Sequence, residues 1–194
     1  MTGCEIVLAS ASPRRQELLR QIGVEPAVHV VEVDETPGEG EPAVVFVERL
    51  ARDKAATAAL ALPDSAVVIG ADTAIEVDGR ILGKPKDFDD AAKMLSRLSG
   101  TRHQVHTGVA VVAGGSVSSS VTSSQVFFRE LTAEEIAVYW RSGEPRDKAG
   151  AYAIQGLGAI FIEKIVGSYS AIMGLPLFAT ARMLEAAGCK ILPS

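Results

Sequence analysis

Apolar residues along the chain repeat with two different periods, one typical of β-strands and the other of α-helices. Strands are predicted by short apolar runs at residues 5–9, 28–33 and 66–77. Between these runs, apolar residues spaced three and four apart predict two helices, one from Pro13 to Gly23 and a longer one that begins at Pro42. Strands and helices that alternate in this way predict a mixed α/β fold.

The second half of the chain predicts a long β-hairpin between two helices. Strand patterns at residues 103–113 and 118–128 are joined by two consecutive glycines, which is typical of a turn. The helices are predicted at residues 87–98 and from the capping box at 132–135 to Gly143, and a final strand and helix follow. Serines crowd residues 116–124, but two valines interrupt them, so a polar edge strand is expected. Because no repeat and no clear domain boundary occur, residues 1–194 are expected to form one domain.

The composition is that of an ordinary globular domain with an acidic surface. The 194 residues are 47% hydrophobic and 22% charged, with a formal net charge of −5. Such a surface attracts neither nucleic acid nor an anionic membrane, so any anion site must be local. Two cysteines are too few for a disulfide framework and no secretory leader occurs, so a reducing, cytoplasmic location is expected. The three histidines are interpreted as structural or solvated.

Two adjacent arginines stand in the first turn of the first predicted helix, where positive charge is unfavourable. Ser12 is a suitable N-cap and Pro13 suits the first helical position, but Arg14 and Arg15 then repel the partial positive charge of the helix N-terminus. A bound phosphate would relieve that repulsion. The alternative is that the arginines extend into solvent or pair with Glu17 or another carboxylate. Two arginines in a row after Ser-x-Ser-Pro favour the phosphate.

A lysine lies on the apolar face of the second predicted helix. Lys54 follows Val47, Leu50 and Ala51 at spacings of seven, four and three, so it is expected on the core side of the helix. The simplest explanation is that its aliphatic stem packs while the ammonium group reaches water. Beside the arginine pair, Lys54 is also a candidate for binding an anion.

An aspartate lies at the end of an otherwise apolar strand. Asp72 follows Gly70 in the run Ile-Gly-Ala-Asp-Thr, and a carboxylate buried there requires a cation, a hydrogen-bond donor or a metal ion. Gly70 permits the close approach of a ligand or another part of the backbone. Asp72 is therefore a candidate metal ligand or general base, and the alternative is a structural aspartate bound to backbone amides.

Two further candidates lie in predicted turns. Lys84, in a Gly-Lys-Pro turn, suits contact with a phosphate. Gln155, in a loop bracketed by glycines, carries an amide whose donor and acceptor match the edge of a pyrimidine base. For each residue the alternative is an ordinary exposed turn position.

Several of these features belong to motifs that follow one another in a fixed order. The motifs are Leu-Ala-Ser-Ala-Ser-Pro-Arg-Arg-Gln-Glu-Leu-Leu, Glu-Arg-Leu-Ala-Arg-Asp-Lys-Ala, Gly-Ala-Asp-Thr, Gly-Lys-Pro, Leu-Ser-Gly-x-x-His-Gln-Val, Lys-Ala-Gly-Ala-Tyr-x-Ile-Gln-Gly and Gly-Ser-Tyr-x-x-x-x-Gly-Leu-Pro. Together they resemble the Maf family of nucleoside triphosphate pyrophosphatases over nearly the whole chain. The arginine pair, Thr73 and Gln155 resemble the branch that acts on dTTP and UTP rather than the sister branch for 7-methyl-GTP.

The resemblance implies an elongated mixed β-sheet flanked by helices, similar to that of inosine triphosphatases, with a substrate cleft between two lobes. It implies hydrolysis of a nucleoside triphosphate to the monophosphate and pyrophosphate, with Mg²⁺ or Mn²⁺ held by Glu35 and Asp72. Asp72 would also orient or deprotonate the attacking water. The residues implied to bind substrate are Ser10, Arg14, Arg15, Lys54, Thr73, Lys84 and Gln155. A homodimer is also implied.

Other classes of protein remain open at this point. A nucleotide-binding regulator of cell division would use the same residues without turnover. A purely structural domain would leave Arg14, Lys54, Asp72 and Lys84 unrelated in space. A P-loop enzyme is disfavoured, because the pattern Gly-x-x-x-x-Gly-Lys-Ser/Thr is absent from the sequence.

Overall fold

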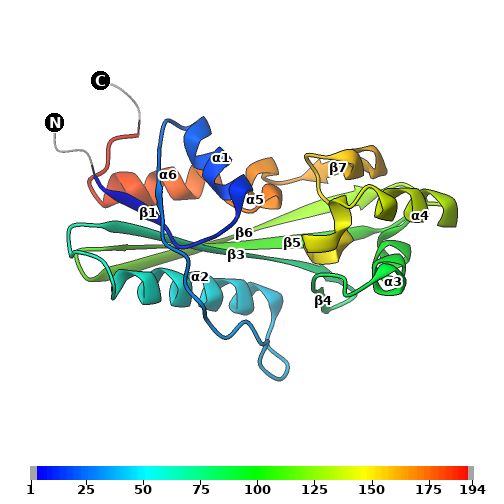
Figure 1. Ribbon diagram of the computed structural model, residues 1–194, viewed down its shortest axis with the longest axis horizontal. Coiled ribbons are helices and arrows are strands. Elements are labelled where there is room, and N and C mark those ends of the chain that lie inside the picture. Colours follow the sequence, from blue (N-terminus) through cyan, green and yellow to red (C-terminus); the bar gives the residue numbers. More distant parts are fainter. Residues whose placement is uncertain (1–3, 192–194) are drawn as a thin grey trace.

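One long β-sheet forms the centre of the computed structural model, which describes residues 4–191 (Figure 1). Its strands lie in the order β2-β1-β3-β5-β6-β7, and β4 pairs with the far part of β3. The strands are β1 (Ile6–Leu8), β2 (Ala27–Val28), β3 (Val67–Val77), β4 (Arg80–Leu82), β5 (Arg102–Ala113), β6 (Ser116–Phe128) and β7 (Ile162–Val166). Because β1 runs parallel to β2 and β3 while the other pairs are antiparallel, the sheet is mixed, as predicted.

Helices cover both faces of this sheet. The α-helices are α1 (Pro13–Gln21), α2 (Ala43–Ala59), α3 (Phe88–Leu98), α4 (Ala133–Arg141), α5 (Tyr169–Met173) and α6 (Leu177–Ala186). Short 3-10 helices are η1 (Glu144–Asp147), η2 (Ala149–Ala151) and η3 (Leu157–Phe161). In Figure 1, α2 lies along one face of the sheet and α1, α5 and α6 along the other. Among the described residues, none of the helices has the length and apolar character needed to cross a membrane.

The long strands β3, β5 and β6 pass through two lobes that have separate hydrophobic cores. In the first lobe, alternate residues of β3 serve two cores, so Val68 packs under α2 while Ile69 packs under α1 and α6. In the second lobe, α3 and α4 cover the other end of the sheet around Leu95, Phe128 and Tyr152. The predicted elongated sheet with two lobes is therefore confirmed.

Most of the predicted elements are present. Gly114 and Gly115 have positive φ in the turn of the β5–β6 hairpin, and Thr132 and Glu135 form the capping box of α4. Residues 116–124 of β6 pair with β5 alone, because the part of β6 that pairs with β7 starts at Gln125. This serine-rich half of β6 is therefore an edge of the sheet, as expected.

The strand predicted at residues 28–33 is wrong for most of its length. Strand β2 comprises only Ala27 and Val28, and the last ladder hydrogen bond runs from the N–H of His29 to the carbonyl of Leu8. Its partner β1 is only three residues long, because the chain leaves the sheet there to enter α1. Val31 and Val33 pack against the cores beside α2 without joining the sheet, and Val30 is exposed.

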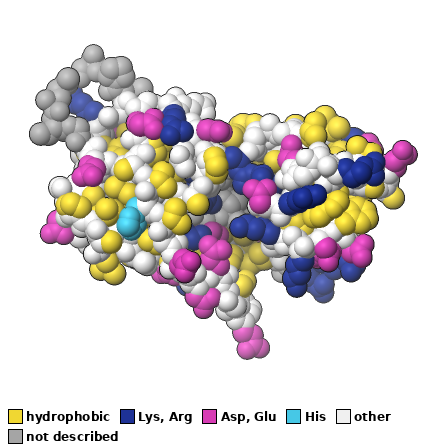
Figure 2. All heavy atoms as spheres, in the orientation of Figure 1, with side chains coloured by type: hydrophobic (Ala, Val, Ile, Leu, Met, Phe, Trp, Pro, Cys, Tyr) yellow, Lys and Arg dark blue, Asp and Glu magenta, His cyan; other side chains and the backbone are white. Residues whose placement is uncertain are grey.

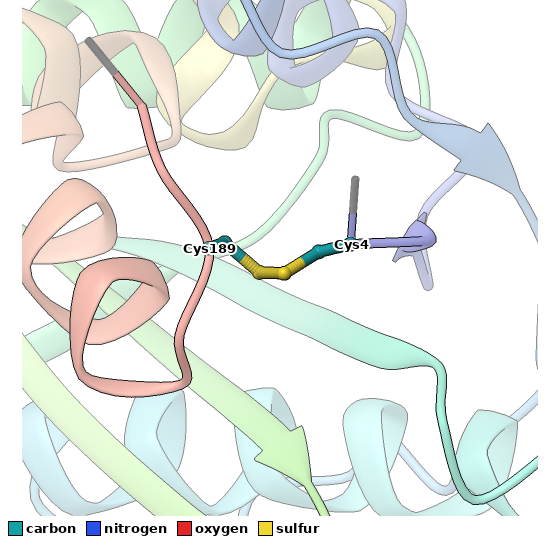
Figure 3. Close-up of a disulfide and its surroundings, with 2 residues drawn as sticks. All are labelled: Cys4 and Cys189. Atoms are coloured by element: carbon teal, nitrogen blue, oxygen red, sulfur yellow. A yellow bond between two sulfur atoms is a disulfide. The ribbon is translucent and has the colours of Figure 1, made fainter. Parts of the chain in front are cut away.

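The two cysteines form a disulfide that joins the beginning of the described chain to its end (Figure 3). Cys4 precedes β1 and Cys189 follows α6, with a sequence separation of 185 and a distance of 5.5 Å between their Cα atoms. The sequence excluded a disulfide framework but did not predict this single pair. The bond holds β1, which leads directly into the arginine-bearing helix α1, against the C-terminal helix.

Two histidines of β5 are buried on opposite faces of the sheet. The Nε2 of His103 lies 2.7 Å from the hydroxyl of Tyr152, and the Nδ1 of His106 lies 2.8 Å from the hydroxyl of Ser123. Burial lowers the pKa of His103 to about 4. These contacts are in keeping with a structural role for both histidines.

Removal of the disulfide is expected to destabilise the fold, because the bond closes a loop of nearly the whole chain and restricts the unfolded state. The double substitution Cys4→Ser and Cys189→Ser should lower the free energy of unfolding by about 2–4 kcal/mol, measured by denaturant titration. A thiol reductant should destabilise the parent protein similarly and leave the double variant unchanged. Equal stability with and without reductant would contradict a disulfide that supports the fold.

The stability of the protein should fall as the pH decreases from about 6.5 to 4. In this range an unfolded histidine binds a proton that folded His103 does not, so protonation favours the unfolded state, whereas above about pH 6.5 this contribution is complete. His103→Gln should reduce the pH dependence by about 3 kcal/mol at most. Unfolding titrations at several pH values would measure the difference, and parallel curves for the two proteins would exclude a contribution from His103.

Candidate functional site

The candidate site lies where one edge of β3 is left unpaired. β1 accompanies β3 only as far as Leu8 opposite Ile69, and β4 begins its pairing opposite Ile75. Within the described chain, residues 70–74 of β3 therefore have a partner strand on one side only, which is β5. Side chains from helices on the two faces of the sheet can meet across this gap. Figure 2 shows the surface indented between the lobes, with basic and acidic side chains gathered there.

Two glycines let α2 lie unusually close to the sheet beside this gap. A Cβ atom at Gly70 would lie 2.1 Å from the carbonyl oxygen of Ala51, and one at Gly108 would lie 2.3 Å from that of Val47. No larger residue fits without moving the helix. The close approach predicted at Gly70 is thus made by the backbone of α2, which brings Lys54 to the strand.

Lys54 forms two ion pairs at the gap. Its Nζ lies 2.7 Å from Oδ1 of Asp72 and 2.6 Å from Oε1 of Glu35, which belongs to the acidic loop before α2. The side chains of Lys54 and Asp72 are only 11% and 13% exposed, whereas that of Glu35 is 58% exposed. The hydrogen bond from Lys54 is the main reason that the pKa of Glu35 lies below its usual value. The alternative in which Lys54 simply reaches water is therefore wrong.

Arg15 is held at the gap by neutral groups. Its guanidinium donates to the carbonyl of Gly174 at 2.9 Å, to Oγ of Ser10 at 2.9 Å and to Oγ1 of Thr73 at 3.4 Å. These bonds use three of its five N–H donors and leave two for a ligand. Burial lowers the pKa of Arg15, and the nearby carboxylate of Asp72 partly opposes that effect. Arg15 neither extends into solvent nor hydrogen-bonds to a carboxylate of the described residues.

Arg14 is half-buried beside Arg15. Burial lowers its pKa, against the attraction of Asp147 in the second lobe and of Glu17. Its Nε is buried and has no hydrogen-bond partner among the described residues. Ser12 occupies the predicted N-cap position, but its side chain makes no capping bond, and the first turn of α1 holds no acidic residue. The N-terminus of α1 thus keeps polar N–H groups that could donate hydrogen bonds to a bound anion.

The remaining candidates, Lys84 and Gln155, form no hydrogen bond with the residues of the site among the described contacts. Lys84 is exposed after β4, and its charge helps to hold the pKa of Glu35 low, so the two lie near each other. Gln155 is exposed in the turn between η2 and η3, and its side chain has no hydrogen bond within the described residues. Two bonded groups meet at the gap, with Arg14 and Lys84 beside them. The first comprises Ser10, Arg15 and Thr73, and the second comprises Glu35, Lys54 and Asp72.

The carboxylates present suit a divalent metal ion only in combination with other ligands. Among residues 4–191 there is no group of three or more His, Cys, Asp or Glu side chains placed to hold a metal ion. Glu35 and Asp72 nevertheless converge on one cation, the ammonium group of Lys54. Mg²⁺ is commonly held by one or two carboxylates while phosphate oxygens and waters complete its coordination. The pair therefore fits a metal ion that arrives with a phosphate ligand.

Sequence reasoning missed Thr107, which supports the site from β5. Its hydroxyl lies 3.0 Å from that of Thr73 and 2.7 Å from the carbonyl oxygen of Ala171, and the residue is completely buried. The available signal was a polar residue in the middle of the apolar strand pattern at 103–113. Gly174 was also missed, because a backbone carbonyl that serves as an acceptor leaves no trace in the sequence.

Comparisons with known proteins identify the family. The model of the family described as Maf-like protein matches residues 5–187. A protein of Vibrio cholerae named dTTP/UTP pyrophosphatase is 50% identical over 185 residues, which cover 95% of this chain and 99% of that protein. A protein of Hahella chejuensis with the same name is 51% identical over 188 residues, or 96% and 94% of the two chains. The chain therefore belongs to the Maf-like protein family, as the motifs indicated.

Comparison with solved structures adds a weaker likeness. The Staphylococcus aureus Ham1 protein matches 62% of this chain and 69% of its own, with 22% sequence identity and a TM-score of 0.43.

Substitution of Gly70 by alanine should disturb the site through α2. The added methyl group meets the backbone of the helix, so we expect a loss of about 1–3 kcal/mol in the free energy of unfolding, measured by denaturant titration. Gly83→Ala is the matched control, because a Cβ atom there meets nothing within 4 Å. Equal losses in the two variants would show that α2 does not depend on the glycine for its place on the sheet.

Proposed function

We propose that this protein is a nucleoside triphosphate pyrophosphatase that hydrolyses dTTP and UTP to the nucleoside monophosphate and pyrophosphate. The main support is one observation: at the unpaired edge of β3, Arg15 hydrogen-bonds to Thr73, and the next residue, Asp72, is ion-paired with Lys54, which also pairs with Glu35. This arrangement puts donors for a polyphosphate beside carboxylates that could serve a metal ion and a water molecule. The names of the two relatives described above support the same reaction.

The proposed phosphate contacts come from the cationic side of the site. Arg15 has two N–H groups to offer, and Arg14 has a buried Nε without a partner among the described residues. Lys84 would reach the phosphates from the turn after β4, and Ser10 with the first amides of α1 would complete the cradle. These groups would stabilise the charge that grows on the departing pyrophosphate.

The proposed attack on the α-phosphorus depends on Asp72. Only Oδ1 of this carboxylate is bonded to Lys54, so Oδ2 can accept a hydrogen bond from a water molecule and orient or deprotonate it. We propose that Glu35 and Asp72 would hold Mg²⁺ or Mn²⁺, which when bound would neutralise negative charge on the phosphates. Lys54 would then keep the two carboxylates at the correct separation and exchange part of its contact with them for a phosphate oxygen.

The proposed selection of the base uses Gln155, Thr73 and Arg14. Uracil and thymine carry an N3–H next to a carbonyl, and one glutamine amide can match both groups. Cytosine presents an acceptor at N3, so the same arrangement disfavours it. The exposed position of Gln155, without a partner among the described residues, leaves its amide available for this contact.

Two expectations about the protein in the cell stay predictions. A homodimer is implied by the family resemblance alone. A cytoplasmic location was inferred from the low cysteine content, and the Cys4–Cys189 disulfide weighs against it, because such bonds are rare in reducing compartments.

The proposal is tested with a panel of nucleoside triphosphates in the presence of Mg²⁺ or Mn²⁺, with monophosphate and pyrophosphate as the measured products. We expect dTTP and UTP to be the preferred substrates. Asp72→Asn should lower kcat/KM by about 100-fold or more, because the amide cannot accept the proton of the water. Asp64→Asn, at an exposed position, is the control and should keep full activity.

Two results would contradict this reaction. Release of nucleoside diphosphate and inorganic phosphate would place the attack at the wrong phosphorus. Tight retention of the nucleotide without pyrophosphate release would support a non-catalytic nucleotide-binding regulator.

A further inference from the structure

A chain of hydrogen bonds runs from the site across strands β3 and β5 to helix α5, on the face of the sheet that α1 also covers (Figure 1). Thr107 of β5 lies directly opposite Thr73 of β3, and their hydroxyl oxygens are 3.0 Å apart. Thr107 also contacts the carbonyl oxygen of Ala171 in α5 at 2.7 Å. On the other side, Thr73 contacts the guanidinium of Arg15. Four groups from four elements thus form one continuous chain.

The direction of each bond in this chain follows from the number of protons available. A carbonyl oxygen can only accept, so the single hydroxyl proton of Thr107 goes to Ala171. Thr73 must then donate its own proton to Thr107, since a hydroxyl group has only one. Arg15 can only donate, and it does so to the oxygen of Thr73. Each hydroxyl therefore accepts one hydrogen bond and donates one, all in the same direction.

We propose that Thr107 is a positioning residue that makes Thr73 an obligatory acceptor toward the substrate. Thr107 holds the proton of Thr73 away from the gap, so that only lone pairs of Thr73 face Arg15 and any bound ligand. A ligand group in contact with Thr73 must then be a donor. This inference rests on the proposed function, in which Thr73 takes part in selecting the base.

The consequence for the base is a discrimination based on its N3 position. The N3–H of uracil or thymine, which Gln155 is proposed to accept, can be shared with the free lone pair of Thr73 in a three-centre hydrogen bond, whereas the N3 of cytosine brings a further acceptor to the same place. Two acceptors without a proton between them repel each other in a desolvated site. Thr107, which does not itself need to touch the nucleotide, thereby contributes to the preference for UTP over CTP.

The experiment compares kcat/KM for UTP and CTP in the parent protein, Thr107→Val and Thr107→Ser. Valine keeps the shape of threonine but removes the acceptor for the proton of Thr73, which then becomes free to donate. The ratio of kcat/KM for UTP to that for CTP should fall about tenfold in Thr107→Val, in line with the loss of one directed hydrogen bond. Serine keeps the hydroxyl group and should restore the ratio.

Thr180→Val is the matched control for the loss of a buried hydroxyl. Thr180 is also completely buried and donates to a backbone carbonyl, that of Pro176, but it has no bond to a residue of the site among the described contacts. This variant should lower Tm while leaving the ratio unchanged. A merely structural role for Thr107 would give the same pattern as Thr180.

The results separate the inference from the proposed function. If the parent protein prefers UTP over CTP and Thr107→Val keeps that preference, the inference is overturned and the function stands. If the parent protein cleaves neither nucleotide, the proposed function fails; if it cleaves both equally, the proposed selection of the base fails. In either case the selectivity assigned to Thr107 fails with it. A double-mutant cycle of Thr73→Val and Thr107→Val on Tm is an independent check, since additive losses would also overturn the directed chain of bonds.

Discussion

The unpaired edge of β3 is the constraint on which the rest of the site depends. A sheet ordinarily separates the groups on its two faces, and here the end of β1 and the late start of β4 leave residues 70–74 accessible from both sides. Arg15 extends from α1 on one face and Lys54 from α2 on the other, yet both are attracted by the negative charge of Asp72. Strands that continued through the gap would keep these groups apart, so the short β1 is a requirement of the site.

The site gathers positive charge that the molecule as a whole lacks. The chain carries a net charge of −5, whereas the arginine pair, Lys54 and Lys84 lie together at the gap with Glu35 and Asp72, and with Glu17 and Asp147 near Arg14. An acidic protein with cations gathered at one place repels polyanions in general and binds a small one at that place. Because Arg15 is held by neutral oxygens, its charge remains available to a ligand.

The sequence predicted the elements and the members of the site better than it predicted how they are held. Periodicity identified α2 and β3, and the unfavourable charges of Arg15 and Lys54 identified candidates for anion binding, because local conflicts of this kind follow from chemistry within one element. The length of β2 was wrong, since it is set by the partner strand and not by its own residues. The role of Thr107 could not be predicted, because it depends on the pairing of two strands 34 residues apart.

The pairing of β3 with β5 places two different site residues on the two faces of β3. Asp72 faces α2 and lies opposite Gly108, the residue that lets α2 approach; Thr73 faces the other way and lies opposite Thr107, the residue that takes its proton. The dipeptide Thr107–Gly108 of β5 thus complements the dipeptide Asp72–Thr73 of β3 residue by residue. A shift of one position in register would place a side chain against α2 and leave Thr73 without its acceptor. The register of these two strands therefore determines the positions of both the carboxylate proposed to orient the water and the oxygen proposed to face the base.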